Sequence, residues 1–190
     1  MIIKKAEFIT SAGTGSKLVD YGLPEFAFVG RSNVGKSSLI NYLAERNTLA
    51  KTSSAPGRTR LINYFNINDK YIFVDLPGYG FAQAGKTEQA AWQQLIGGYL
   101  ENSPQLKRVF VLADIRHTPS VKDKEMLQYL YHYQLPFTVV VTKADKLSHS
   151  QATRQAREIA AALGLGKDDV VVVSASKRVG KEKIWGIIEN

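Results

Sequence analysis

The sequence predicts an α/β domain with a six-stranded, mostly parallel sheet, one antiparallel strand and helices on both faces. Short runs of β-branched and aromatic residues recur along the chain. They are nearly continuous rather than alternating, which is typical of strands buried on both faces of a sheet. Segments with helical spacing separate most of them. Two runs are joined by only three residues, too few for a crossover helix, so these two should be antiparallel.

The elements follow in chain order. Buried strands are expected at 26–29, 71–74, 109–112, 137–141 and 170–173. Residues 61–67 and 71–74, joined by Asn68-Asp69-Lys70, should form the antiparallel hairpin. A helix is expected over 38–45, and apolar residues at helical spacing predict others around Leu127 and Ile159. Gly164 should end the last of these, since glycine favours helix C-termini.

Composition narrows the class of protein. A length of 190 residues suits one domain, and we expect residues 1–22 to form an N-terminal extension packed on a domain of residues 23–190. The chain has no cysteine, which excludes disulfides, thiol nucleophiles, zinc thiolate sites and iron–sulfur clusters.

No stretch approaches ~18 consecutive apolar residues, and the N-terminus lacks the apolar region of a signal peptide. A soluble cytoplasmic protein without membrane contact is therefore expected.

The charge balance favours an anionic partner. Lys and Arg number 25 against 17 Asp and Glu, a formal net charge of +8. Such an excess suits nucleic acid most simply, and a merely solvated basic surface is an equally good explanation.

Residues 30–37, Gly-Arg-Ser-Asn-Val-Gly-Lys-Ser, fit the phosphate-binding pattern G-x-x-x-x-G-K-[ST], the P-loop. Its glycines allow a tight turn that presents backbone N–H groups to phosphate oxygens. Lys36 supplies a positive charge at the β- and γ-phosphates, Ser37 a hydroxyl ligand for Mg²⁺, and the following helix its N-terminal dipole. A buried strand before the loop and a helix after it are the context that the motif requires.

A second motif, Asp75-Leu76-Pro77-Gly78, follows directly on the strand 71–74. An aspartate at this end of a strand beside the P-loop strand can hold Mg²⁺ through water, and the Gly78 N–H can reach a γ-phosphate. A plain strand-ending turn is the alternative.

A third motif, Thr142-Lys143-Ala144-Asp145, indicates guanine rather than adenine. The Asp145 carboxylate can accept from the ring N–H and the exocyclic amine of guanine, whereas adenine would leave it unpaired. Lys143 can lie along the base, and a backbone N–H of Ser174-Ala175-Ser176 can meet the guanine carbonyl. Each of these segments follows the carboxyl end of a strand, and open α/β sheets bind their ligands at those ends. An ATP-using kinase is correspondingly disfavoured.

The segment 46–60 between the P-loop helix and the hairpin is polar, basic and without clear periodicity. In a GTP site this is where a mobile switch supplies a second hydroxyl to Mg²⁺. Thr59, in Pro56-Gly57-Arg58-Thr59, is the preferred candidate and Thr52 the alternative.

With these motifs the chain resembles the TRAFAC-class GTPases, and within them the EngB (YihA/YsxC) family of bacterial ribosome-biogenesis GTP-binding proteins. The resemblance rests on residues 30–38, 56–59, 75–82, 114–117, 142–145 and 174–176. It implies a Ras-like fold, GTP or GDP with Mg²⁺, a role in large-subunit assembly through ribosomal RNA, and a requirement for normal cell division and septation. A monomer is expected. The nucleotide is expected to contact Gly30, Arg31, Ser32, Asn33, Val34, Gly35, Lys36, Ser37, Ser38, Gly57, Arg58, Thr59, Asp75, Leu76, Pro77, Gly78, Thr142, Lys143, Ala144, Asp145, Ser174, Ala175 and Ser176.

Catalysis is expected to involve Lys36, Thr59, Gly78 and Asn33. Tyr79 stands where Ras-type switches carry the glutamine that orients the attacking water, so intrinsic hydrolysis should be slow. By resemblance, Asn33 helps to bind a K⁺ ion that takes the place of an arginine finger. The alternative is that Asn33 only tolerates a left-handed turn, which asparagine does well.

Two functional classes remain open from the sequence. The first is a GTP-dependent switch that docks on ribosomal RNA, which the basic residues Arg46, Lys51, Arg58 and Arg60 of the switch segment favour. The second is a GTPase that acts mainly through protein contacts with the division machinery. For Asp114, which ends a buried strand, function and packing are equally good explanations.

Overall fold

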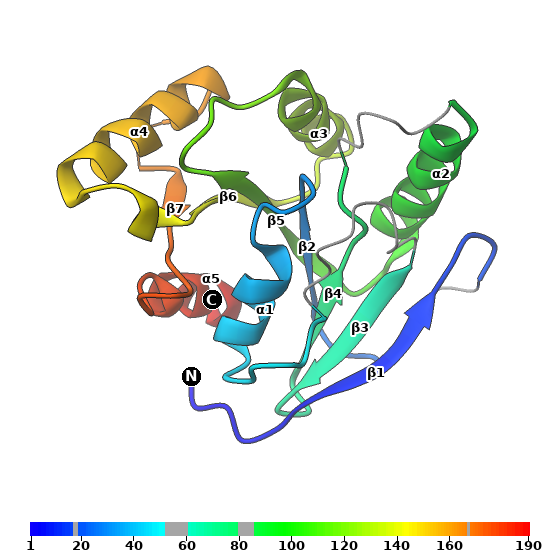
Figure 1. Ribbon diagram of the computed structural model, residues 1–190. Helices are drawn as coiled ribbons and strands as arrows, with labels where there is room; N and C mark the ends of the chain where they lie inside the picture. Colours follow the sequence, from blue (N-terminus) through cyan, green and yellow to red (C-terminus); the bar gives the residue numbers. More distant parts are fainter. Residues whose placement is uncertain (17–18, 52–60, 80–85, 167) are drawn as a thin grey trace.

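The computed structural model describes residues 1–16, 19–51, 61–79, 86–166 and 168–190. Seven strands and five α-helices alternate along much of this chain (Figure 1). The strands are β1 (Ala6–Ala12), β2 (Glu25–Gly30), β3 (Ile62–Ile67), β4 (Tyr71–Asp75), β5 (Leu106–Asp114), β6 (Phe137–Thr142) and β7 (Val170–Val172). The helices are α1 (Lys36–Leu43), α2 (Lys86–Asn102), α3 (Val121–His132), α4 (His149–Ala162) and α5 (Lys181–Glu189), with a short 3₁₀ turn, η1 (Ala144–Lys146).

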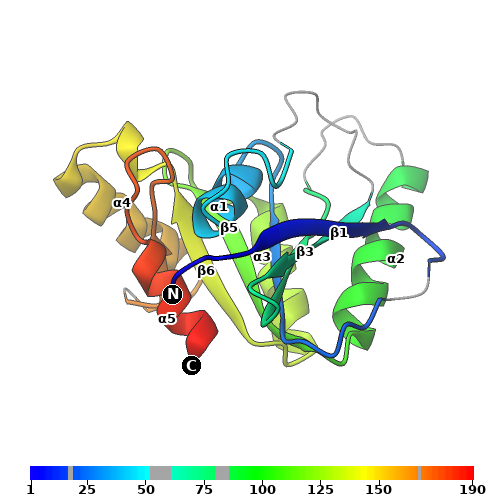
Figure 2. The ribbon, with the colours of Figure 1, turned by 90° about the horizontal axis from the view of Figure 1, so that it is seen from below.

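All the strands form one sheet in the order β1-β3-β4-β2-β5-β6-β7. The predicted hairpin is confirmed, because β3 pairs with β4 in antiparallel register, while β4, β2, β5, β6 and β7 pair in parallel. The prediction of six strands was wrong. Strand β1 adds a seventh at the edge, antiparallel to β3, and it is the strand nearest the viewer in Figure 2.

The prediction missed β1 because an edge strand faces solvent and therefore needs no continuous apolar run. Glu7 and Phe8 of β1 are exposed, and only Ala12 is fully buried. Because β1 runs against β3, it points the same way as the parallel strands. Among the described strands β3 alone is reversed, as the sequence predicted. The domain boundary at residue 23 stays a prediction.

Helices cover both faces of the sheet, as expected. Leu39 and Ile40 of α1 pack with Trp185 of α5 in the core on one face. Residues of α2, α3 and α4 form the core of the other face. The two termini lie close together (Figure 1), and the Met1 ammonium is 3.7 Å from a carboxylate oxygen of Glu189. No helix in the described part of the chain is both long and apolar enough to cross a bilayer.

Strand β2 gives the site a rigid base. All six of its residues are buried. The Phe28 ring lies between those of Phe73 on β4 and Phe110 on β5, with centroid distances of 5.0 and 5.2 Å. The loop that follows Gly30 therefore leaves the most completely packed strand of the sheet.

Local capping fixes where two of the helices begin. Ser120 and Asp123 form a capping box at the start of α3, and Ser148 and Gln151 form one at the start of α4. In each box a serine hydroxyl accepts from a backbone N–H while the partner side chain accepts in return. The loops that precede α3 and α4 leave the same end of the sheet. The two capping boxes therefore fix where these loops end, near the candidate site.

Candidate functional site

The sequence motifs meet at one end of the sheet. The segment 30–37 follows β2, Asp75 ends β4, Thr142 ends β6, and Ser174 lies just beyond β7. These strands run parallel in the order β4-β2-β5-β6-β7, so their carboxyl ends share one edge. The fold thus brings together in space segments that lie up to about 140 residues apart in the chain, at the edge where open α/β sheets bind ligands.

The glycines of the segment 30–37 are required by its geometry. A Cβ atom on Gly30 would lie 2.9 Å from Val34 Cγ1 and 3.0 Å from the Leu112 carbonyl oxygen. Gly35 has a φ of 104°, a conformation that disfavours residues with a side chain. Helix α1 begins at the next residue, and its first N–H groups have no acceptor within the helix. This arrangement favours an anion at the start of α1.

The side chains of this loop suit phosphate and a hard cation. Ser32 Oγ is buried and has no hydrogen-bond partner among the described residues, and buried hydroxyls in proteins are normally paired. The Lys36 ammonium forms an ion pair with the Asp75 carboxylate. The Ser37 hydroxyl and the Asp75 carboxylate are the oxygen ligands that Mg²⁺ prefers. The residues present therefore fit a Mg²⁺-bound phosphate group.

The segment Asp75–Tyr79 packs directly against the loop. A Cβ atom on Gly78 would lie 3.2 Å from the Gly30 carbonyl oxygen and 3.4 Å from the Ser32 nitrogen. The Tyr79 N–H donates to the Gly30 carbonyl at 3.2 Å, and the Ser32 N–H donates to the Tyr79 carbonyl at 3.3 Å. A side chain at position 78 would force these backbone segments apart by a few tenths of an ångström, which explains the glycine there.

The Tyr79 side chain is buried in the protein interior. The residue is 5% exposed, and its ring lies edge-on to Trp92 of α2, with centroids 6.1 Å apart. Its hydroxyl donates to Asp123 Oδ1 at 2.8 Å. Burial, followed by the nearby Asp123 charge, raises the pKa of Tyr79 far above its usual value, so the phenol remains a neutral donor. Tyr79, at the position of the glutamine in Ras-type switches, is thus buried and connects the phosphate loop to α3.

The last residue of β6 and the residue that follows it are bound to the phosphate loop through their side chains. Thr142 Oγ1 donates to the Val34 carbonyl at 2.6 Å. Lys143 has a φ of 60°, and its ammonium donates to the Asn33 carbonyl at 2.6 Å. These bonds hold residues 142–145 and the phosphate loop in a fixed relation.

Asp145 is an ionised acceptor beside the loop that follows β7. Ser174 Oγ donates to Asp145 Oδ1 at 2.7 Å. This hydrogen bond, supported by one from Ser176, lowers the pKa of Asp145. The Ala144 N–H donates to the Val173 carbonyl at 3.1 Å, so the two loops are joined through their backbones as well. A fixed carboxylate is what reading two adjacent N–H donors of a base requires.

Gly57, Arg58 and Thr59, with the alternative Thr52, lie outside the described residues. Asn33 has a φ of 62°, which is the left-handed conformation of the structural explanation. Its proposed contribution to a K⁺ site stays a prediction.

The sequence reasoning missed the side chains that connect the motifs. Asp123 accepts from Tyr79, and Asp114, left open between function and packing, accepts from both Arg116 and Lys143. The capping pattern Ser120-x-x-Asp123 was readable as the start of a helix. Nothing in the sequence indicated that the same carboxylate reaches Tyr79, which is 44 residues away.

The fold and the arrangement of these motifs are those of a P-loop GTPase. The family model described as "50S ribosome-binding GTPase" matches residues 25–143, more than half of the chain. The chain belongs to the EngB family of GTP-binding proteins. Over its full length it is 49% identical to the probable GTP-binding protein EngB of Desulforamulus reducens, covering 93% of that protein. It is 46% identical to the EngB of Desulfosudis oleivorans, with complete coverage of both chains.

Solved structures agree on the fold. A crystal structure of a probable GTP-binding protein EngB superimposes with a TM-score of 0.71 at 25% identity, covering 86% of this chain and 96% of that one. A point variant of Aquifex aeolicus Era, bound to GDP and aluminium fluoride, gives a TM-score of 0.68 at 25% identity. That match covers 87% of this chain and 56% of the Era chain.

Proposed function

We propose that this EngB-family protein is a GTP-dependent switch that acts in assembly of the large ribosomal subunit and hydrolyses GTP slowly to GDP and phosphate. One observation carries the proposal. Thr142 and Lys143 bind residues 142–145, which we call the base-reading loop, to the phosphate loop. This geometry suits a ligand with both a purine base and a phosphate chain. By its resemblance to the family, we also propose that the protein is cytoplasmic and needed for normal cell division and septation.

Each motif has its own role in the proposed reaction. Backbone N–H groups of the phosphate loop and the Lys36 ammonium hold the phosphates, and Asp145 selects guanine. Ser37 and Thr59 would bind Mg²⁺ directly, and Asp75 would bind it through water. The metal, when bound, neutralises charge on the β- and γ-phosphates. The Gly78 N–H would hold the γ-phosphate, so the segment 75–79 responds to whether GTP or GDP is present.

Slow hydrolysis follows from the position of Tyr79. Its hydroxyl is bound to Asp123 and its ring is buried, so it offers no amide to orient a water molecule. We therefore propose that hydrolysis depends on help from elsewhere, supplied by a bound cation or by the partner.

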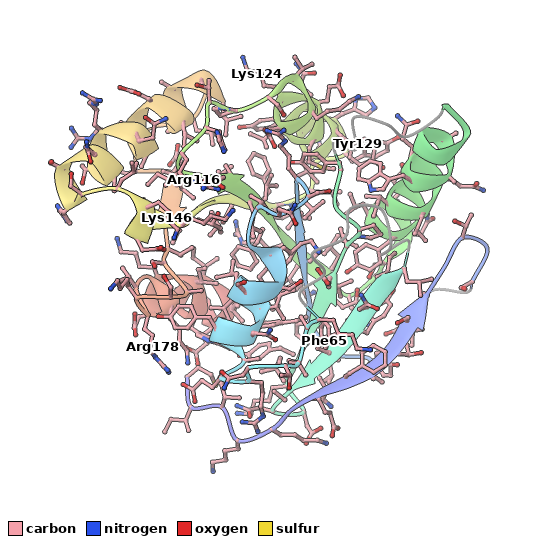
Figure 3. All side chains as sticks on the ribbon, in the orientation of Figure 1. Phe65, Arg116, Lys124, Tyr129, Lys146 and Arg178 are labelled. Carbon is pink, nitrogen blue, oxygen red and sulfur yellow. The ribbon has the colours of Figure 1, made fainter. Side chains whose placement is uncertain are left out.

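A ribosomal partner is supported by the family and by charge. The matching family model is described as a ribosome-binding GTPase, and the net charge is +8. Arg31, Lys146 and Lys177 are exposed at the end of the sheet that carries the motifs, and Figure 3 shows Arg116 and Lys146 on the side where β6 and β7 lie. Exposed cations next to a nucleotide-dependent surface suit a phosphate backbone.

Association with the large ribosomal subunit is expected to be stronger with GTP than with GDP and to fall steeply with salt. An interface that neutralises about six phosphates loses about 10³-fold in affinity between 50 and 200 mM salt. Co-sedimentation with purified subunits, with a non-hydrolysable GTP analogue or GDP over a salt series, measures both effects. Binding that ignores salt, or is equal with both nucleotides, would instead favour the alternative of protein contacts with the division machinery.

The K⁺ hypothesis for Asn33 has a direct assay. If the Asn33 amide helps to hold K⁺, single-turnover hydrolysis should be on the order of tenfold faster in K⁺ than in Na⁺ at equal ionic strength, because the cation offsets charge in the transition state. Asn33→Gly is the matched variant, since glycine accepts the φ of 62° but has no amide. It should lose the K⁺ advantage. Equal rates in the two salts for the native protein would make Asn33 structural.

A further inference from the structure

Asp114 lies at the C-terminal end of β5, between the strands that carry the two halves of the site. Strand β5 pairs with β2, which leads to the phosphate loop, and with β6, which leads to the base-reading loop. Asp114 is paired with Thr142 in the register with β6, and its side chain is 11% exposed. A carboxylate here is within reach of both loops.

The two oxygens of Asp114 are shared between two cations. Oδ2 accepts from the Lys143 ammonium at 2.8 Å and from Arg116 Nη2 at 2.7 Å. Oδ1 accepts from Arg116 Nε at 2.9 Å and from the Arg116 N–H at 3.1 Å. Burial alone would raise the pKa of Asp114, but the hydrogen bonds from Arg116 and Lys143 outweigh it and hold the pKa well below its usual value. The carboxylate is therefore ionised over the whole neutral range.

The Lys143 ammonium bridges β5 and the phosphate loop. It contacts Asp114 and the Asn33 carbonyl together. The Lys143 stem passes near the phosphate loop, because a Cβ atom on Gly35 would lie 3.8 Å from Lys143 Cε. A lysine has four side-chain torsions, and a single neutral carbonyl acceptor would leave its charge only partly compensated. Asp114 supplies the opposite charge that keeps the extended side chain in place.

We propose that Asp114 is a positioning residue for nucleotide binding: it holds Lys143 across the phosphate loop so that the base and phosphate subsites are fixed relative to each other. The inference rests on the proposed function, because it concerns the residence time of the same guanine nucleotide. A site that is already ordered loses less conformational entropy on binding, and such effects are expressed mainly in the dissociation rate. Arg116 donates to the same carboxylate and balances the remaining charge of Asp114.

The test is the release rate of a fluorescent GDP derivative, followed by stopped flow. Asp114→Asn keeps the size of the side chain but removes its charge, and should speed release by about 10- to 100-fold, the effect of one charge-assisted hydrogen bond. Arg116→Gln is the matched control, since it removes the other partner of the same carboxylate. It leaves the contact between Lys143 and Asp114 in place, so its effect on the release rate should be clearly smaller than that of Asp114→Asn.

A double-mutant cycle separates positioning from general destabilisation. If Asp114 acts through Lys143, then Asp114→Asn should add little to the release rate once Lys143→Ala is present. The preference for GDP over XDP should be unchanged in Asp114→Asn, because that preference belongs to Asp145. Loss of folded protein lowers the signal amplitude, whereas the release rate reports on the molecules that remain folded.

Several outcomes would overturn the inference. These are unchanged release from Asp114→Asn, additive effects of the two substitutions, or an equal acceleration in Arg116→Gln. If Asp114→Asn does not fold, Asp114→Glu keeps the charge, and it should release GDP more slowly than Asp114→Ser; the reverse order would also overturn it. A native protein that does not bind the GDP derivative at all would instead contradict the proposed function itself.

Discussion

Asp145→Asn should transfer the preference of the protein from guanine to xanthine nucleotides. In the structure the Asp145 carboxylate is fixed by Ser174 and is ionised, so it presents two acceptors to the base. Guanine offers two donors on that edge, whereas xanthine has a carbonyl in place of the exocyclic amine. An asparagine presents one acceptor and one donor, which matches xanthine and leaves guanine with an unpaired donor.

The expected change is large because buried polar groups are unpaired in the mismatched complex. Sites built on such hydrogen bonds discriminate by about 10⁴-fold, and the ratio of GDP to XDP affinity should fall by that order. Calorimetric titration with both nucleotides measures it. Asp168→Asn changes an exposed carboxylate before β7 and should leave the ratio unchanged. Unaltered GDP affinity in Asp145→Asn would show that another residue reads the base.

Ser37→Ala should weaken both GTP and GDP in the presence of Mg²⁺, by about 100-fold. Ser37 lies in the first turn of α1, next to Lys36, which pairs with Asp75. We propose its hydroxyl as a Mg²⁺ ligand in both nucleotide states. The bound metal ion contributes several kcal/mol of charge stabilisation at a phosphoryl group, and part of this is lost when a ligand of the ion is removed. Thr59→Ala should weaken GTP only, because the switch is held through the γ-phosphate.

Ser38→Ala provides the matched control for this pair. Ser38 is expected to contact the nucleotide through its backbone N–H, which alanine retains, so both affinities should stay close to those of the native protein. Titrations with and without Mg²⁺ distinguish metal from phosphate contacts, and the Ser37→Ala defect should disappear when Mg²⁺ is removed. Equal losses of GTP and GDP in Thr59→Ala would contradict its assignment to the switch.

The parts of the fold that the sequence predicted are those with a strong local signal. Strands β4, β5 and β6 are buried on both faces, so their composition alone identifies them. Strand β1 pairs with β3 at an exposed edge, where packing places few demands on residue type. Helix α2 was not predicted, because its apolar residues Ile96, Tyr99 and Leu100 are outnumbered by polar and small ones.

The candidate site also has a part that the sequence predicted and a part that it did not. Its motifs could be predicted, since each consists of a few residues that are close together in the chain. Their mutual contacts were not, because Lys143 and Asn33 are 110 residues apart and only the finished sheet brings them together. The inward direction of the Tyr79 side chain could not be predicted from the sequence either, since it depends on packing against Trp92 and on the Asp123 carboxylate.

The strand order has a consequence for synthesis of the chain. Strands β1, β2, β3 and β4 are complete once residue 75 has been made, and together they form one contiguous side of the sheet. Because domains are built from the N-terminus at about 5–20 residues per second, the phosphate-binding half emerges from the ribosome several seconds before Asp145 and Ser174. Asp145 and Ser174 take their places only when the last two strands have joined the sheet, so we expect discrimination of guanine to arise last during synthesis.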